Sequence, residues 1–146
     1  MPETAVRVDP ALAFRFEVKF DGLPAAGFSE CTGLQADTEV MEYVEGGLNT
    51  NVHRLPTRTR HGNLTLKRGV VDATFWRWYD DLVRGLVSRR GGTLLIYAPN
   101  GVDTAAEWQI RNAFPAKWSG PDLSASQNSV AVETVEIAHE GLTRVR

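Results

Sequence analysis

The chain has 146 residues, 42% of them hydrophobic and 23% charged, so we expect one folded domain over residues 1–146 rather than a disordered chain. Sixteen Lys and Arg against 18 Asp and Glu give a net charge of −2, which is not the basic footprint of a dedicated nucleic-acid binder. The single cysteine, Cys31, excludes an intramolecular disulfide and fits folding in a reducing cytoplasm. No stretch approaches the roughly 20 apolar residues of a membrane helix, and Met1–Pro10 lacks the apolar core of a signal peptide, so we expect no direct membrane insertion.

Alternating apolar and charged residues predict antiparallel strands in the first half of the chain. After a loose N-terminal arm over residues 1–12, the clearest pattern is Phe14–Phe20, which has one apolar and one charged face. Gly27–Leu34 is a weaker strand with Phe28 as its anchor. Asn63–Arg68 alternates again, and its two leucines are expected to point inward.

A hairpin is predicted between these strands. Asp37–Glu45 alternates, but neither of its faces is purely apolar, as in a strand that protrudes from the core or meets another subunit. Gly46–Asn49 predicts the turn, and Thr50–Leu55 the returning strand. Pro56–Gly62 has the composition of a basic, polar loop.

One helix is predicted, over residues 73–90, with Asp72 as its N-cap and Gly91-Gly92 as its end. Trp76 falls beside its apolar stripe and is expected to be exposed or at an interface. The stripe, at helical spacing, comprises Phe75, Trp78, Tyr79, Leu82, Val83 and Leu86.

The last third of the chain predicts further strands. Thr93–Ala98 and Glu107–Asn112 are connected through the turn dipeptide Asn100-Gly101. Ala113–Trp118 is a proline-broken segment. The apolar phase of the final strand, Val130–His139, shifts along its length, which predicts a bulge or a strand that passes between two environments.

These elements predict a mainly β fold: an antiparallel β-sandwich or partly closed barrel with one α-helix packed on the outside. Such a fold leaves long sheet edges. A monomer must hide its edges, whereas a subunit that assembles can leave them for its neighbours.

Chemistry-bearing residues form no recognisable catalytic or metal-binding pattern. His53, His61 and His139 are widely spaced, without a metal-ligand repeat. His139-Glu140 resembles an acid–base pair, but neighbouring residues of a strand point to opposite faces. Cys31 is interpreted as a small buried thiol rather than a nucleophile. We therefore predict no enzymatic activity, no cofactor and no metal.

The charged clusters have competing interpretations. The acidic residues of Asp37–Glu45 and of the final strand are interpreted as solvated faces. A basic stretch is either a polyanion contact, a solvated loop, which we favour, or a surface that docks on the acidic strand of another subunit. It comprises Arg54, Arg58, Arg60, His61, Lys67 and Arg68.

Five runs of the sequence together resemble the phage tail tube protein family. Asn112–Leu123 reads NAFPAKWSGPDL and resembles the family's NAFP-x-KW-x-GP-x-L run. Asn128–Leu142 is similar to its ending, N-x-VA-x-E-x-x-E-x-AHEGL. Shorter matches are Phe28–Leu34, the turn Glu45-Gly46-Gly47, and Leu66–Gly69, and Trp78 falls where the family has a helix tryptophan. The resemblance extends from about Phe14 to the C-terminal region.

The resemblance implies a structural subunit of a contractile injection particle. Family members form hexameric rings that stack into a tube inside a contractile sheath, between a baseplate and a tube terminator, with cargo protein or DNA in the lumen. Strands of neighbouring subunits join into a β-barrel around the channel, and the helix lies toward the outside. The protein would be made in the bacterial cytoplasm and become part of a phage tail or an extracellular injection particle.

The resemblance and the mixed-face strands suggest where subunits meet. The Asp37–Leu55 hairpin would extend toward the adjacent ring or line the channel, and the final strand would give one face to a neighbour. Charge reversal at Glu133 is then expected to impair ring assembly and leave the monomer folded, and Pro115 and Pro121 are expected to fix the loop before that strand. The candidate subunit-interface residues are Glu39, Glu42, Glu45, Gly46, Gly47, Asn49, Arg54, Glu133, Glu136 and His139.

Two alternatives stay open at this point. A tube-initiating or baseplate subunit of the same family would share the fold and form a single ring. A soluble effector- or ligand-binding module would not form tubes.

Overall fold

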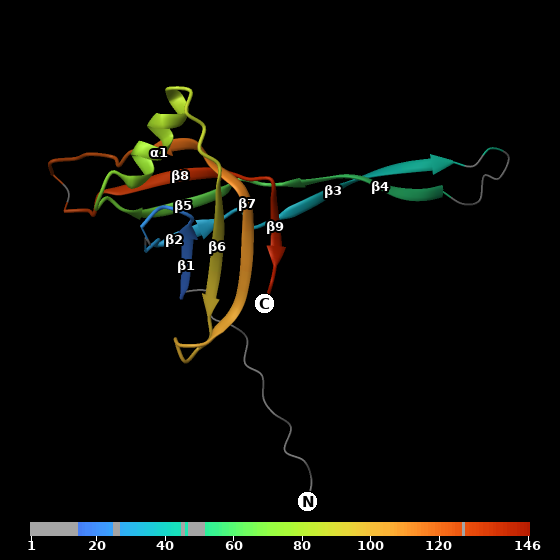
Figure 1. Cartoon of the computed structure of the whole chain (residues 1–146), viewed down its shortest axis with the longest axis horizontal. Helices are drawn as coiled ribbons and strands as arrows, with labels where there is room; N and C mark the ends of the chain where they lie inside the picture. The colour runs from blue at the N-terminus through green and yellow to red at the C-terminus, as the bar shows by residue number, and fades with distance from the viewer. Residues whose placement is uncertain (1–14, 25–26, 45, 47–51, 127) are drawn as a thin grey trace, which may run out of the picture.

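The computed structural model describes residues 15–24, 27–44, 46, 52–126 and 128–146, and its strands and helix are shown in Figure 1. In chain order the elements are β1 (Phe16–Phe20), β2 (Glu30–Thr32), β3 (Ala36–Val44), β4 (Val52–His61), β5 (Leu64–Gly69), α1 (Thr74–Val83), β6 (Arg90–Tyr97), β7 (Thr104–Ser119), β8 (Val132–Ala138) and β9 (Gly141–Arg144).

Two antiparallel sheets of very different character make up the fold. The larger has seven strands in the order β1-β6-β7-β8-β5-β2, with β9 paired to β7 beside this path. The smaller contains only β3 and β4, which extend away from the rest of the molecule (Figure 1). The mainly β fold with one helix is thus confirmed, although the large sheet stays open between β1 and β2 and "partly closed barrel" describes it only loosely.

Strand β7 is long because it serves both halves of the large sheet. Its first part pairs with β6 on one side and with β9 on the other, and its last part pairs with β8. Between these parts Asn112 has a φ of 49°, in the left-handed region that asparagine tolerates better than most residues. The strand can therefore turn from one pairing partner to the next without ending.

The prediction of a proline-broken segment over Ala113–Trp118 is wrong, because these residues belong to β7. Pro115 is almost fully buried, opposite Ile137 of β8. The register shifts between Pro115 and Lys117, and a β-bulge is one of the few places where a sheet accepts a residue without an N–H donor. Pro115 therefore shapes a strand rather than a loop.

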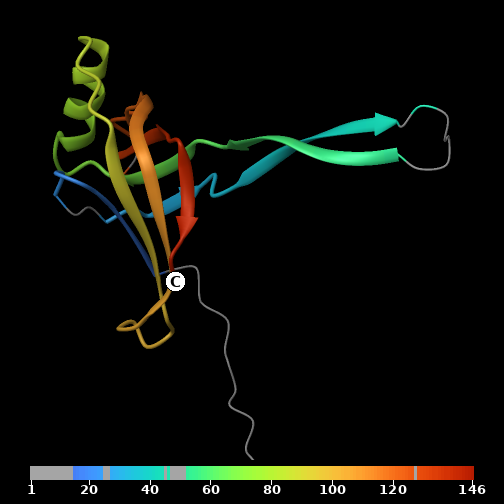
Figure 2. The ribbon, with the colours of Figure 1, turned by 45° about the vertical axis from the view of Figure 1, so that its right-hand side comes forward.

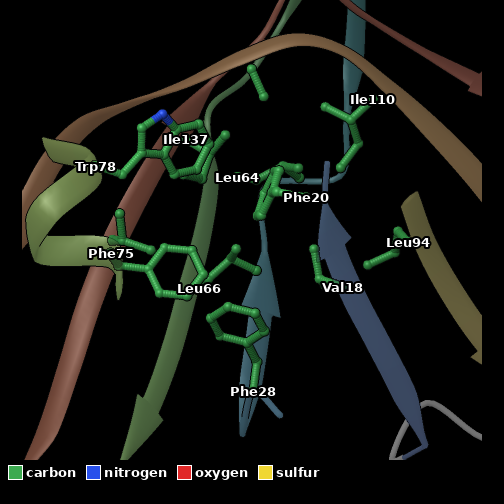
Figure 3. Close-up of a cluster of buried hydrophobic side chains, with 12 residues drawn as sticks. Val18, Phe20, Phe28, Leu64, Leu66, Phe75, Trp78, Leu94, Ile110 and Ile137 are labelled. Carbon is green, nitrogen blue, oxygen red and sulfur yellow. The ribbon is translucent and has the colours of Figure 1, made fainter. Parts of the chain in front are cut away.

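The hydrophobic core lies between the concave face of the large sheet and α1 (Figure 3). Inward positions alternate along β5, where Leu64 and Leu66 have no exposed surface, as the alternating pattern predicted. Phe28 is buried and confirmed as an anchor, and from the helix Phe75 and Trp78 enter the same cluster. The remaining members are Val18, Phe20, Leu94, Ile110, Ala113, Val135 and Ile137.

The helix is shorter than predicted, ending at Val83 instead of near Arg90. Gly85, with a φ of 88°, ends it in a Schellman motif: the Gly85 N–H donates to the Leu82 carbonyl and the Leu86 N–H to the Asp81 carbonyl. Leu86 is consequently 66% exposed and outside the apolar stripe. At the other end the N-cap is Ala73, without a side-chain cap, so the prediction of Asp72 as N-cap is wrong by one residue, although an Asp72 carboxylate oxygen accepts the Thr74 N–H at 3.0 Å.

The predicted phase shift in the last long strand is also wrong. Strand β8 runs from Val132 to Ala138 with a single inward parity, and Glu133 occupies the first inward position ahead of Val135 and Ile137. Val130 and Val132 point outward and are exposed. The apparent shift arose because a charged residue stands where the pattern requires an apolar one.

Candidate assembly surface

The β3–β4 hairpin, here called the arm, protrudes from the body of the molecule (Figure 2). Every described residue of its two strands is exposed except His61, which lies at its root and is half-buried. Several of the exposed side chains are large and apolar, each between 44% and 57% accessible: Val40, Met41, Tyr43, Val44, Val52 and Leu55.

Cross-strand pairing sorts these side chains onto two faces of the arm. Residues directly opposite in an antiparallel pair project to the same face. One face therefore carries the pair Met41–Leu55 together with Tyr43 opposite His53. The other carries Val44–Val52 and, beyond Glu42, Val40 opposite Pro56. Both faces thus present apolar groups to solvent.

The arm neutralises much of its own charge. Glu42 is paired in register with Arg54, and Arg60 lies opposite Asp37 and 3.8 Å from the Glu39 carboxylate. Arg54 and Arg60 therefore each lie opposite or near an acidic residue of their own hairpin, and docking of the acidic strand on another subunit's arginines stays a prediction. The predicted loop over Pro56–Gly62 is in fact the second half of β4, up to His61.

The arm buries little apolar area within the monomer. An isolated two-stranded hairpin is marginally stable at best in water, because neither face buries enough apolar area. Contiguous exposed apolar groups of this kind mark interaction sites in soluble proteins. The arm is therefore the strongest candidate for an assembly contact on the described surface.

Two histidines meet at the root of the arm. The rings of His61 and His139 are 5.5 Å apart between centroids. The His139 Nδ1 accepts the Gly141 N–H at 3.2 Å, so its Nε2 carries the proton and donates to the Gly62 carbonyl at 3.0 Å. Burial, and then the neighbouring His61, lower the pKa of His139. His139 is thus a neutral structural residue here, with no acid–base arrangement toward Glu140.

Glu133, predicted to face a neighbour, lies inside the subunit instead. It is 2% exposed, and its two carboxylate oxygens accept hydrogen bonds from Arg68 Nε at 2.5 Å and from Trp118 Nε1 at 3.0 Å. Arg68 is itself 3% exposed and also donates to Asp72 at 2.7 Å. The carboxylate is a buried partner of a buried arginine, so reversing its charge would disrupt the folded monomer, contrary to the expectation stated above.

The sequence patterns missed this network because its members lie far apart along the chain. Arg68 looked like one more member of a basic stretch, and Asp72 like a helix cap alone. The signal that could have found the network is a charged residue at an inward parity position, on β5 for Arg68 and on β8 for Glu133. Two such residues of opposite charge on neighbouring strands are expected to pair.

The remaining candidate interface residues lie on β8, at the tip of the arm or outside the described residues. Glu136 lies on the outward face of β8, 3.9 Å from Lys117. Gly46 is exposed at the tip of the arm. Glu45, Gly47 and Asn49 lie outside the described residues. The interface role of the exposed residues stays a prediction.

Cys31 faces a hollow of about 260 Å³ at the open side of the large sheet, lined also by Phe16, Leu34, Leu94 and Ile96. Burial raises the pKa of its thiol to about 11, so it is protonated at neutral pH and a poor nucleophile. Within the described part of the chain, no group of three or more His, Cys, Asp or Glu could hold a metal ion. No helix among these residues is long and apolar enough to cross a membrane.

A family model described as T4-like virus tail tube protein gp19 matches residues 12–143. This chain belongs to that family. The resemblance inferred from Asn112–Leu142 and the shorter runs is thereby confirmed, and so is the assignment to the structural tube components of contractile injection systems. A sequence search of curated proteins gives no match.

Solved structures of contractile particles share the fold of this tail tube protein. A chain of the PVC sheath–tube complex, an extracellular contractile injection system in its extended state, has a TM-score of 0.82 at 23% identity, covering 92% of this chain and 90% of that chain. The tube-terminating cap of the anti-feeding prophage has a TM-score of 0.85 at 23% identity, covering 98% and 95%. A chain of the anti-feeding prophage baseplate has a TM-score of 0.76 at 26% identity, covering 95% and 97%.

Proposed function

We propose that this tail tube protein is the repeating subunit of the inner tube of a contractile injection particle, assembling as stacked hexameric rings. The observation that carries the proposal is the arm, whose two strands expose apolar side chains on both faces and contact no core of their own. A second copy of the same chain can supply the missing cover, and a head-to-tail contact repeated by rotation closes into a ring.

Six-fold symmetry is supported by the related baseplate chain, which comes from a particle reconstructed as 6-fold symmetrised. The open edges of β1 and β2 support the same proposal, since an unpaired edge can accept a neighbour's strand. The proposed partners are therefore further copies of this chain, a sheath protein around the tube, and baseplate and terminator proteins at its two ends. Cargo protein or DNA would occupy the lumen.

On this proposal the chain acts mechanically and has no catalytic role. It is made in the bacterial cytoplasm and then becomes part of an assembled phage tail or extracellular particle. The protonated Cys31 and the neutral, hydrogen-bonded His139 support a structural role for the groups most often used in catalysis.

The test is negative-stain electron microscopy of the purified full-length protein, paired with arm variants. Met41→Glu with Leu55→Glu places two charges on one apolar face of the arm without touching the core. We expect long tubes from the wild type, and dispersed but folded protein from the double variant. Thr38→Glu with Thr59→Glu, at an exposed polar pair nearer the root, is the matched control for added charge. Normal tubes from the Met41→Glu, Leu55→Glu variant would show that this face of the arm has no role in assembly.

A single-ring role is the second candidate, and it has its own supporting observation. The terminating cap shares the fold with a TM-score of 0.85, against 0.82 for the sheath–tube chain, so fold likeness does not favour the repeating role over the terminal one. Electron microscopy distinguishes the two, because a terminal or initiating subunit would stop at single rings where a repeating subunit forms tubes. A preparation with neither rings nor tubes, but with tight binding of another molecule, would favour the ligand-binding module.

A further inference from the structure

The concave face of the large sheet is only partly covered by the rest of the subunit. The ends of β1, β6, β7 and β9 that lie farther from α1 extend past β2 and the segment that follows it (Figure 1). Two hollows open on this face: the one of about 260 Å³ around Cys31, and a second of about 300 Å³ at the root of the arm. The core therefore leaves part of the inner face of the sheet accessible.

The two hollows form one apolar groove. Leu34, in the segment between β2 and β3, lines both of them. On the sheet, Leu94 of the first hollow lies directly opposite Trp108 of the second in the β6–β7 register, so these side chains are neighbours on one face. The groove thus extends from β1 to β9 and the root of the arm. Its main apolar residues are Phe16, Leu34, Leu94, Ile96, Trp108 and Leu142.

The charged side chains that line the groove already have partners within the subunit. Glu30 lines the first hollow, and its carboxylate lies 3.7 Å from Lys67. Arg144 lines the second, and its guanidinium lies over the Trp108 ring, 5.3 Å from the centroid. A charge brought into the groove by another molecule would lose its hydration without gaining a free counterion. An uncharged, apolar surface therefore fits the groove best.

The free edge of β1 borders the groove. Phe16 at the start of β1 lines the first hollow, and among the described residues β1 pairs with β6 alone. The N–H and C=O groups on its other edge are therefore available to a further strand. An extended segment can pair with such an edge and direct every second side chain into the adjacent hollow. A β-strand is consequently a better occupant than a helix.

One face of the arm has the composition that the groove requires. Met41, Tyr43 and Leu55 share this face and are each between 44% and 51% exposed. The opposite face carries the pair Glu42 and Arg54. The arm of the same subunit extends away from the body (Figure 2), and its root lines one end of the groove. It cannot fill its own groove, so a second copy has to supply the arm.

We propose that the groove receives the arm of another copy of this chain, with Met41, Tyr43 and Leu55 turned toward the sheet. The inference rests on the proposed function, because it names the surface that the arm contacts in the tube. Arm and groove are different surfaces of one chain, so the contact is heterologous and each subunit offers one of each. Such a contact repeats from copy to copy, whereas a subunit at the end of a stack leaves one of the two surfaces unused.

Complementation between two assembly-defective variants tests the groove. Met41→Glu with Leu55→Glu disables the arm and keeps the groove, while Leu34→Glu disables the groove and keeps the arm. Leu34 is 38% exposed, so the glutamate adds a charge to both hollows without entering the core. We expect each variant alone to stay dispersed. An equimolar mixture should form a complex of about twice the 16.1 kDa mass of the chain in analytical ultracentrifugation, and stop there because its free arm and free groove are the defective ones.

The outcomes separate the groove from the proposed function. Leu123→Glu, at an 85% exposed leucine outside the groove, is the matched control and should assemble as the wild type does. Wild-type tubes together with a mixture that stays monomeric, or Leu34→Glu protein that forms normal tubes, would overturn the groove and leave the tube role intact. Wild-type single rings together with a two-chain complex in the mixture would support the groove and remove the repeating tube role.

A cross-linking measurement covers the case in which Leu34→Glu does not fold. Cys31 is the single cysteine of the chain and lines the groove. Met41→Cys adds a thiol on the arm face that enters the groove, and Val40→Cys adds one at the neighbouring position on the opposite face. We expect a short thiol–thiol cross-linker to join assembled Met41→Cys subunits into ladders on denaturing gels and to leave Val40→Cys monomeric. Equal cross-linking of the two variants, or none in Met41→Cys assemblies, contradicts the proposal.

Discussion

Replacing Glu133 by glutamine tests the buried ion pair, the largest departure of the structure from its sequence pattern. The substitution preserves the shape of the side chain and removes its charge. Arg68, 3% exposed, would lose its closest anion and keep only Asp72 at 2.7 Å. A glutamine amide also cannot accept from both Arg68 and Trp118 through its two terminal atoms, so one of these donors would face an N–H group.

The magnitude follows from the burial of both partners. Removing one member of a buried ion pair costs about 3–5 kcal/mol, because an uncompensated charge stays in the interior. Asp72 compensates Arg68 in part, so we expect a loss of about 3 kcal/mol in the free energy of unfolding of Glu133→Gln. Urea denaturation of the dispersed full-length protein, followed by tryptophan fluorescence, measures this loss as a lower midpoint with an unchanged slope.

Two companion variants make the result decisive. Glu136→Gln removes the neighbouring outward carboxylate, whose partner Lys117 is 3.9 Å away and largely exposed, and it should cost less than about 1 kcal/mol. Replacing both buried partners, as Arg68→Met with Glu133→Leu, should recover most of the loss, because no buried charge remains. Equal losses for Glu133→Gln and Glu136→Gln would refute the argument that burial makes the inner pair important.

Three further predictions concern single positions. Gly33→Ala should lower the free energy of unfolding, measured by urea denaturation, by about 2–3 kcal/mol, because φ is +89° and a Cβ would collide with a backbone carbonyl. Gly27→Ala is the control and should be nearly neutral, because a Cβ there would meet nothing within 4 Å. Phe75→Ala should cost about 3–5 kcal/mol through the cavity it opens in the core, whereas Val83→Ala, at a 64% exposed position, should cost little in the same assay. The Thr74 amide, and then Arg68, lower the pKa of Asp72 to about 2. The stability that the Asp72 carboxylate contributes is therefore present above about pH 4 and lost as the pH falls through 2. Unfolding midpoints measured across this pH range should change less for Asp72→Asn than for the wild type.

Local patterns predicted the strands whose two faces differ in polarity. β1 and β5 each place apolar residues at every second position against the core, and the turn at Asn100-Gly101 connects β6 to β7 where the dipeptide indicated. That this hairpin would protrude was also predictable, because neither face of its strands is apolar enough to pack on a core. The helix was overextended because Leu86 continued the apolar spacing, and the sequence alone did not show that Gly85 would adopt a left-handed conformation.

Segments stabilised by distant partners were not predictable in this way. β4 continues through Pro56 to His61 because β3 pairs with it across a register shift between Thr38 and Val40. β7 continues through Pro115 because β8, which follows later in the chain, pairs with it and places Ile137 opposite Pro115. In both strands a proline suggested an end, and a bulge opposite the partner strand accommodates it.

Glu133 shows how such a failure can carry information. Its inward position broke the apolar alternation of β8, and a phase shift was the simplest local explanation. The structure keeps the phase and instead supplies Arg68, at an inward position of the neighbouring strand β5, in the same register row. A break in alternation therefore has two explanations, a bulge or a buried partner, and they differ in what lies on the adjacent strand. Here β5 carries an arginine at its own inward parity, so pairing the two anomalies would have located this inner network before the fold was known.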